Sequence, residues 1–163
     1  MQALQTPGTA EDIGRRVLTL VENVRGPDDI APSRIEALTG INVEFNPDDV
    51  NEYGFSGQLT EAWVYNLVSL PEGAGKPPLR IMFSFDDETR ANANMAPVCA
   101  LDFDDYAAVL TAAGFVSNPV RGHQDRLLYW DFSRGDVSVQ IHVRGENDAK
   151  AGHACVSRLI INA

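Results

Sequence analysis

The sequence predicts an α+β fold, a helix-on-sheet sandwich in which helices pack on an antiparallel sheet. Apolar residues at helical spacing occur near the start of the chain and again after residue 102, and several segments of alternating hydrophobicity follow each of these stretches. The connections between the alternating segments are rich in Gly, Pro and Asp, which favours hairpins. We therefore expect one domain over residues 1–163 with two halves, 9–98 and 99–163, each a helix followed by antiparallel strands.

The first half is expected to begin with a helix from about Ala10 to Val24. Its apolar residues recur at helical spacing, and Thr9 is placed to cap the first turn. The segment Arg25-Gly26-Pro27 ends this helix. A second, short helix is predicted to open at Pro32 and to close at Gly40.

Strands are expected to complete the first half. Residues 41–45 alternate in hydrophobicity, and an acidic loop is predicted at 46–55. The longest β pattern runs from Gly57 to Leu70 and is expected to pair as a hairpin with residues 79–85. Residues 86–96 have no periodicity and are predicted to form a loop.

The second half repeats the order of helix and strands. Asp102 is placed to cap a helix over 103–113, and Gly114 ends it. The four predicted strands that follow are 115–120, 126–133, 137–143 and 155–162. A tight turn at 133–136 joins the middle two of them.

Charge is unevenly distributed along a chain whose formal net charge is -10. Residues 28–61 carry eight carboxylates and one cation, Arg34, and residues 86–105 carry six carboxylates and Arg90. Such a field attracts basic partners and repels nucleic acid and anionic membranes. The apolar runs are only a few residues long, so we expect no membrane insertion. The expected partner is a basic protein.

The acidic segment 46–55 also contains aromatic residues, a combination that favours protein-binding surfaces. The candidate partner-binding residues are Asp48, Asp49, Glu52, Tyr53 and Phe55, with Asp86, Asp87 and Glu88 expected nearby. The alternative is that Tyr53 and Phe55 fold back into the core. A second candidate surface is the polar face of the strand at 137–143, formed by Ser138, Gln140, His142 and Arg144.

The two cysteines, Cys99 and Cys155, are predicted to form a disulfide, with buried thiols as the alternative. A disulfide would close a loop of about 57 residues, worth about 4 kcal/mol on the chain-entropy model. The polar start of the chain is typical of a protein trimmed of its leader. Together these features favour a periplasmic or secreted protein, with a cytoplasmic location as the alternative.

No motif for catalysis or metal binding is present. The serines stand in no Gly-x-Ser-x-Gly elbow, and the histidines and cysteines lack the spacing of zinc ligands. We therefore expect no enzyme activity, no metal and no cofactor. The alternative is a small hydrolase or ligand-binding domain that uses His123, Asp125 and a neighbouring arginine in a cleft.

The repeated order of one helix followed by antiparallel strands resembles inhibitor proteins of the β-lactamase-inhibitor-like kind. It is also similar to bacterial immunity proteins that neutralise effector toxins. The resemblance covers most of the chain and rests on architecture. It implies a protein that binds a basic enzyme or toxin and blocks it with acidic loops, without turnover. A structural subunit of an envelope complex is a third possibility.

Overall fold

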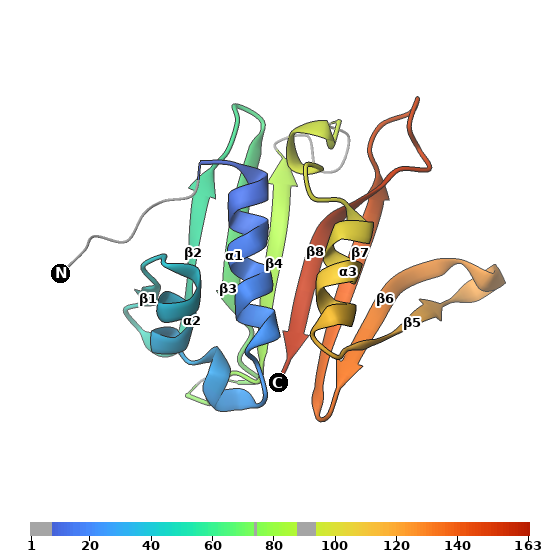
Figure 1. The fold of residues 1–163 in the computed structure, drawn as a ribbon. Coiled ribbons are helices and arrows are strands. Elements are labelled where there is room, and N and C mark those ends of the chain that lie inside the picture. The colour runs from blue at the N-terminus through green and yellow to red at the C-terminus, as the bar shows by residue number, and fades with distance from the viewer. Residues whose placement is uncertain (1–7, 74, 88–93) are drawn as a thin grey trace.

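The computed structural model describes residues 8–73, 75–87 and 94–163, and their strands form one antiparallel sheet (Figure 1). The eight strands have the order β1-β2-β3-β4-β8-β7-β6-β5. Each half of the chain supplies four neighbouring strands, and β4 pairs with β8 at the centre. The predicted α+β class is confirmed, and the two halves share a single sheet.

The described helices follow the sequence prediction closely. They are α1 (Ala10–Glu22), α2 (Pro32–Thr39) and α3 (Phe103–Ala112), with short 3-10 turns at Pro27–Ile30, Ala96–Val98 and His123–Asp125. The Thr9 hydroxyl accepts a hydrogen bond of 3.0 Å from the Asp12 amide at the start of α1. A capping box between Asp102 and Asp105 starts α3.

The strands differ from the prediction in the first half of the chain. They are β1 (Glu44–Asn46), β2 (Asp49–Gln58), β3 (Trp63–Ser69), β4 (Arg80–Asp87), β5 (Val116–Arg121), β6 (Leu127–Arg134), β7 (Val137–Gly145) and β8 (Ala154–Asn162). The predicted loop at 46–55 is wrong, because β2 fills most of it. The predicted long strand is also wrong, because a turn separates β2 from β3. In that turn the Thr60 hydroxyl accepts a hydrogen bond of 3.0 Å from the Trp63 amide.

The core lies between the helices and one face of the sheet. Figure 1 shows α1 in front of the strands of the first half and α3 in front of those of the second half. Burial alternates strictly along β3, where Trp63, Tyr65 and Leu67 are buried and the residues between them are partly exposed. This alternation is typical of a sheet that is covered on one face.

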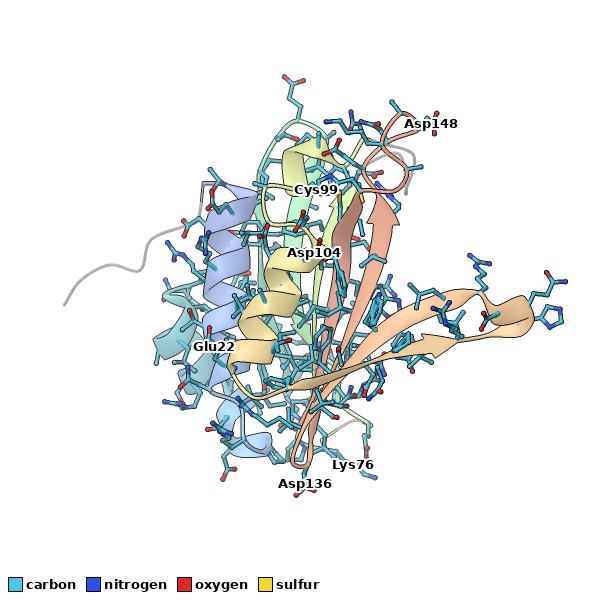
Figure 2. The ribbon with its side chains drawn as sticks, turned by 45° about the vertical axis from the view of Figure 1, so that its right-hand side comes forward. Glu22, Lys76, Cys99, Asp104, Asp136 and Asp148 are labelled. Atoms are coloured by element: carbon cyan, nitrogen blue, oxygen red, sulfur yellow. A yellow bond between two sulfur atoms is a disulfide. The ribbon has the colours of Figure 1, made fainter. Side chains whose placement is uncertain are left out.

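A projecting hairpin, here called the arm and defined as residues 119–129, extends from the second half of the sheet (Figure 2). β6 pairs with β7 from Trp130 onward, whereas its pairing with β5 continues to the tip. The arm therefore leaves the sheet and, in Figure 2, points away from the helices. Its outer strand, β5, is exposed along nearly its whole length.

The predicted disulfide is confirmed: Cys99 and Cys155 are bonded, with their Cα atoms 5.2 Å apart. The bond ties the segment that precedes α3 to the start of β8 in the sheet. It is consistent with an oxidising compartment.

Candidate functional site

The face of the sheet opposite the helices, here called the open face, is covered by none of the described helices (Figures 1 and 2). Residues paired across antiparallel strands share a face, so the register identifies its members. Two paired rows cross it: Ser56, Asn66, Ser84, Arg158 and His142; and Gly54, Val68, Met82, Ile160 and Gln140. The first row is polar and the second has an apolar centre. The open face thus combines both kinds of surface.

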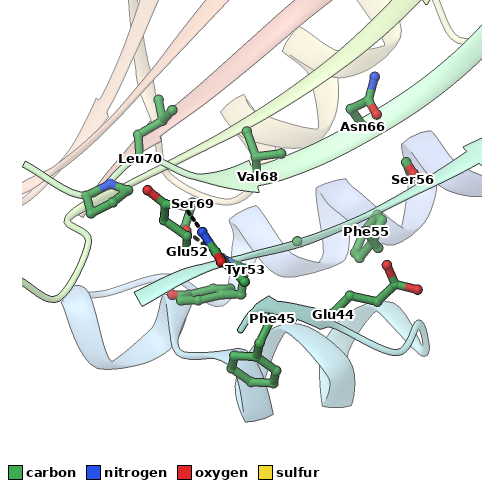
Figure 3. A pocket seen from close by; sticks show the side chains of 13 residues that line it. Glu44, Phe45, Glu52, Tyr53, Phe55, Ser56, Asn66, Val68, Ser69 and Leu70 are labelled. Atoms are coloured by element: carbon green, nitrogen blue, oxygen red, sulfur yellow. Dashed lines mark hydrogen bonds between the residues drawn. The ribbon is translucent and has the colours of Figure 1, made fainter. Parts of the chain in front are cut away.

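A hollow of about 600 Å³ lies over β1, β2 and β3 (Figure 3). In Figure 3 Asn66 and Val68 point away from the helices, whereas the Tyr53 ring points toward them. The lining includes the carboxylates of Glu44 and Glu52 and no lysine or arginine. This first hollow is therefore suited to a cationic side chain of a partner.

A second hollow, of about 540 Å³, lies over β4, β8 and β7, and Leu128 of the arm contributes to its wall. Its Asp86 carboxylate accepts hydrogen bonds from the Asn66 side-chain amide at 2.8 Å and from the Ser84 hydroxyl at 2.7 Å. Arg158 and His142 also line it. Burial, and next the Arg158 charge, lower the pKa of His142, so this imidazole is neutral at pH 7.

The acidic residues of the first predicted cluster occupy different places. Asp48 is exposed in the turn between β1 and β2, and Asp49 begins β2. One Asp49 oxygen accepts a hydrogen bond of 2.9 Å from the Asn51 amide. Glu52 lines the first hollow and accepts a hydrogen bond of 2.6 Å from the Asn46 side-chain amide. Of this cluster, only Glu52 is part of a hollow.

The second predicted acidic cluster does not lie beside the first. β2 and β4 run in the same direction, because both are antiparallel to β3, so Asp49 and Asp87 stand at opposite ends of the sheet. The Asp86 residue is exposed, but the Asp87 side chain is only 1% exposed and lies 3.6 Å from the Arg144 guanidinium. Glu88 lies outside the described residues. The expectation of one joint acidic surface is therefore corrected.

The proposed aromatic anchors are also corrected. Tyr53 and Phe55 are 7% and 6% exposed on the helix side of β2. The Tyr53 hydroxyl donates a hydrogen bond of 2.7 Å to the carbonyl of Ile30, and burial raises the pKa of Tyr53 to about 12. Because Tyr53 and Phe55 stand two positions apart on one strand, their rings lie on the same, buried face of the sheet. Their rings belong mainly to the core, and the small exposed part of each residue contributes to the wall of the first hollow.

The predicted polar face of β7 is present with one exception. Ser138, Gln140 and His142 lie on the open face, but the register shifts between His142 and Val143, where β8 holds the extra residue Ser157. Arg144 therefore pairs with Cys155 and turns to the helix side, where its guanidinium lies 5.6 Å from the centre of the Trp63 ring.

The residues of the alternative hydrolase site lie at the tip of the arm. His123 and Asp125 are exposed, and Gln124 and Asp125 have positive φ angles of 57° and 60°. The Arg121 guanidinium is 3.8 Å from the Asp125 carboxylate. None of these residues lines either of the two hollows.

A cluster that the sequence analysis missed surrounds His153. Its Nε2 lies 2.9 Å from an Asp102 oxygen, and its Nδ1 lies 3.3 Å from a Glu146 oxygen and 3.9 Å from the Cys99 sulfur. Glu146 is 8% exposed. The members come from distant parts of the chain, and the only sequence signal was the neighbouring pair of His153 and Cys155. The cluster holds the loop before β8 against the start of α3.

In the disulfide-bonded protein we expect the pKa of His153 to lie above 6.5 and that of His142 to lie below 6.5. The hydrogen bond to Asp102, and next that to Glu146, raise the pKa of His153, whereas burial lowers the pKa of His142. The stability gained from His153 is then full below pH 6.5 and is lost as the pH rises through its folded-state pKa. An NMR titration of the imidazole signals measures both values.

The control for this titration is Asp102→Asn. It should lower the pKa of His153 and leave that of His142 unchanged. A wild-type His153 that titrates at or below 6.5 would contradict the geometry of the cluster.

Comparisons of the chain with protein-family models, with curated proteins and with solved structures found no match. Among the described residues, none of the helices has both the length and the apolar character needed to cross a membrane.

Proposed function

We propose that this protein binds a basic enzyme or toxin on the open face and neutralises it by occlusion, without turnover. The observation that carries the proposal is the uncovered face of the sheet, with a hollow over each half. Concave, partly apolar surfaces that remain uncovered in a folded domain mark sites of interaction. The architectural resemblance to inhibitor and immunity proteins supports the same class of function.

The size of the open face fits a protein partner. Without the three-residue β1 and the projecting β5, six strands at about 4.8 Å spacing span about 24 Å, and seven residues along a strand span about 23 Å. This flat area of about 550 Å², to which side-chain relief adds, approaches the roughly 800 Å² that each partner of a standard protein complex buries. An apolar centre formed by the half-buried Val68 and Met82 and the buried Ile160, between polar neighbours, also matches the usual anatomy of such interfaces.

The charge of the open face supports a basic partner. Glu44 and Glu52 line the first hollow, and Asp131 pairs with Gln140 on the same face. The partner would place lysine or arginine side chains over these carboxylates, which steer its approach. With the disulfide, this favours a periplasmic or secreted protein.

The open face can be tested with one substitution at its centre. Met82→Arg places a cation in the apolar row, and we expect it to weaken binding of the partner at least tenfold, because central residues dominate interface energies. The measurement is a pull-down from an extract of the source organism, followed by binding kinetics of the captured protein with each folded variant.

Two variants serve as controls. Thr111→Arg adds the same charge on the exposed side of α3 and should leave binding unchanged. Asp48→Lys/Asp49→Lys tests the turn between β1 and β2 and should slow association only modestly. Loss of binding in Thr111→Arg with retention in Met82→Arg would place the interface on the helices.

A further inference from the structure

We propose that the cluster around the disulfide becomes a zinc site when the disulfide is reduced, with Cys99, Cys155, His153 and Glu146 as the ligands. This inference is independent of the proposed partner. One candidate ligand atom from each of these four residues lies within 4.8 Å of the other three.

The distances fit tetrahedral zinc. Ordinary zinc bond lengths place ligand atoms about 3.4 Å apart for a nitrogen and an oxygen and about 3.6 Å apart for a nitrogen and a sulfur. The His153 Nδ1 lies 3.3 Å from the Glu146 oxygen and 3.9 Å from the Cys99 sulfur. The two sulfurs, which the disulfide now joins, have to move apart to about 3.8 Å, and the other ligand atoms already lie within 4.8 Å of one another.

The surroundings supply the second requirement of a zinc site, a fixed orientation of the histidine. The Nε2 of His153 lies 2.9 Å from Asp102. In the zinc-bound form Nε2 would keep its proton and donate it to that carboxylate, and Nδ1, which lies beside Glu146 and Cys99, would give up its proton and bind the ion. A carboxylate on the far nitrogen is the usual partner of a zinc-bound histidine. The capping box holds Asp102 in place through Asp105.

The backbone also holds Glu146 and His153 together. The Glu146 amide donates a hydrogen bond of 3.0 Å to the carbonyl of His153, and the Met95 amide donates one of 2.8 Å to the carbonyl of Glu146. Both cysteines are buried, whereas the His153 side chain is 40% exposed and leaves a path for the ion. Thiolate and imidazole ligands select zinc over calcium or magnesium.

Zinc binding requires two steps, reduction of the disulfide and then coordination of the ion. A water-soluble phosphine reduces the disulfide: the phosphine takes up the oxygen of one water and becomes a phosphine oxide, and the two water protons convert the sulfurs to thiols. Zn²⁺ then binds both sulfurs as thiolates, and the two thiol protons leave to solvent. In the oxidised protein the sulfurs are bonded to each other, so the same four residues hold no zinc through thiolates.

The test is a titration of the whole chain with Co²⁺ under anaerobic conditions, after reduction by the phosphine and again without it. We expect one Co²⁺ per reduced chain, with thiolate charge-transfer and tetrahedral d–d absorption bands, displacement by Zn²⁺, and no such bands in the oxidised chain. His153→Gln and Glu146→Gln should each weaken binding at least tenfold. His123→Gln, at the tip of the arm, should bind as the wild type does.

Asp102→Asn provides a graded check, because loss of such a carboxylate partner weakens metal binding by about 10- to 100-fold without changing the stoichiometry. If the reduced chain unfolds, Zn²⁺ should restore its native circular dichroism. A reduced chain that shows no thiolate bands, or whose binding is unaffected by both His153→Gln and Glu146→Gln, would overturn the proposal.

Discussion

Replacing both cysteines, as Cys99→Ala/Cys155→Ala, is expected to lower the free energy of unfolding by about 4 kcal/mol. The bond joins residues separated by 56 positions, so its loss restores a large conformational freedom to the unfolded chain. It also releases the start of α3 from β8. Urea unfolding of the double variant and the wild type measures the difference.

A second measurement separates the effect of losing the disulfide from the effect of replacing the cysteine side chains. Wild-type protein reduced in the presence of a metal chelator should lose a similar amount of stability. A loss below about 1 kcal/mol in both experiments would show that the disulfide does not constrain the unfolded state as the loop length predicts.

Truncating Tyr53 is expected to damage the fold and not a binding surface. Tyr53→Ala should lower the free energy of unfolding by about 3–5 kcal/mol, because a large buried ring is removed from the core. Tyr53→Phe keeps the ring and loses only the hydrogen bond to Ile30, so the expected cost is about 1 kcal/mol. Thermal and urea unfolding measure both effects.

Phe45 is the matched control for Tyr53. The centres of the two rings are 6.0 Å apart, and Phe45 is 49% exposed. Phe45→Ala should cost much less stability than Tyr53→Ala. Faster dissociation of a partner from a fully stable Tyr53→Phe variant would restore the view that Tyr53 is an interface anchor.

The elements that could be predicted from the sequence are those with strong local signals. The caps Thr9 and Asp102 and the apolar helical spacing placed α1 and α3 to within two residues, and alternation placed β6, β7 and β8. β2 was missed because acidic residues and glycines interrupt its alternation. In β2 the buried residues Tyr53 and Phe55 alternate with Gly54 and Ser56, which lie on the open face and line the first hollow. This alternation is visible only from the pairing of β2 with β3.

The site depends on contacts that a linear pattern does not contain. Arg144 turns to the other face beyond the register shift between β7 and β8, and no glycine or proline at His142, Val143 or Ser157 signals that shift. In the His153 cluster, Cys99 and Asp102 stand about fifty positions before His153, so spacing rules for zinc ligands do not find it. Asp49 and Asp87 were expected to lie near each other, but strand direction places them at opposite ends of the sheet, which the linear sequence does not show.

Site-specific photo-crosslinking in the source organism tests the open face most directly. A photoreactive phenylalanine analogue at Gln140, on the open face, and the same analogue at Thr111, on the exposed side of α3, differ only in the face they probe. We predict a crosslinked protein of defined mass, a basic enzyme or toxin, from position 140 and none from position 111. Crosslinks to one defined protein from position 111 alone would contradict binding through the open face.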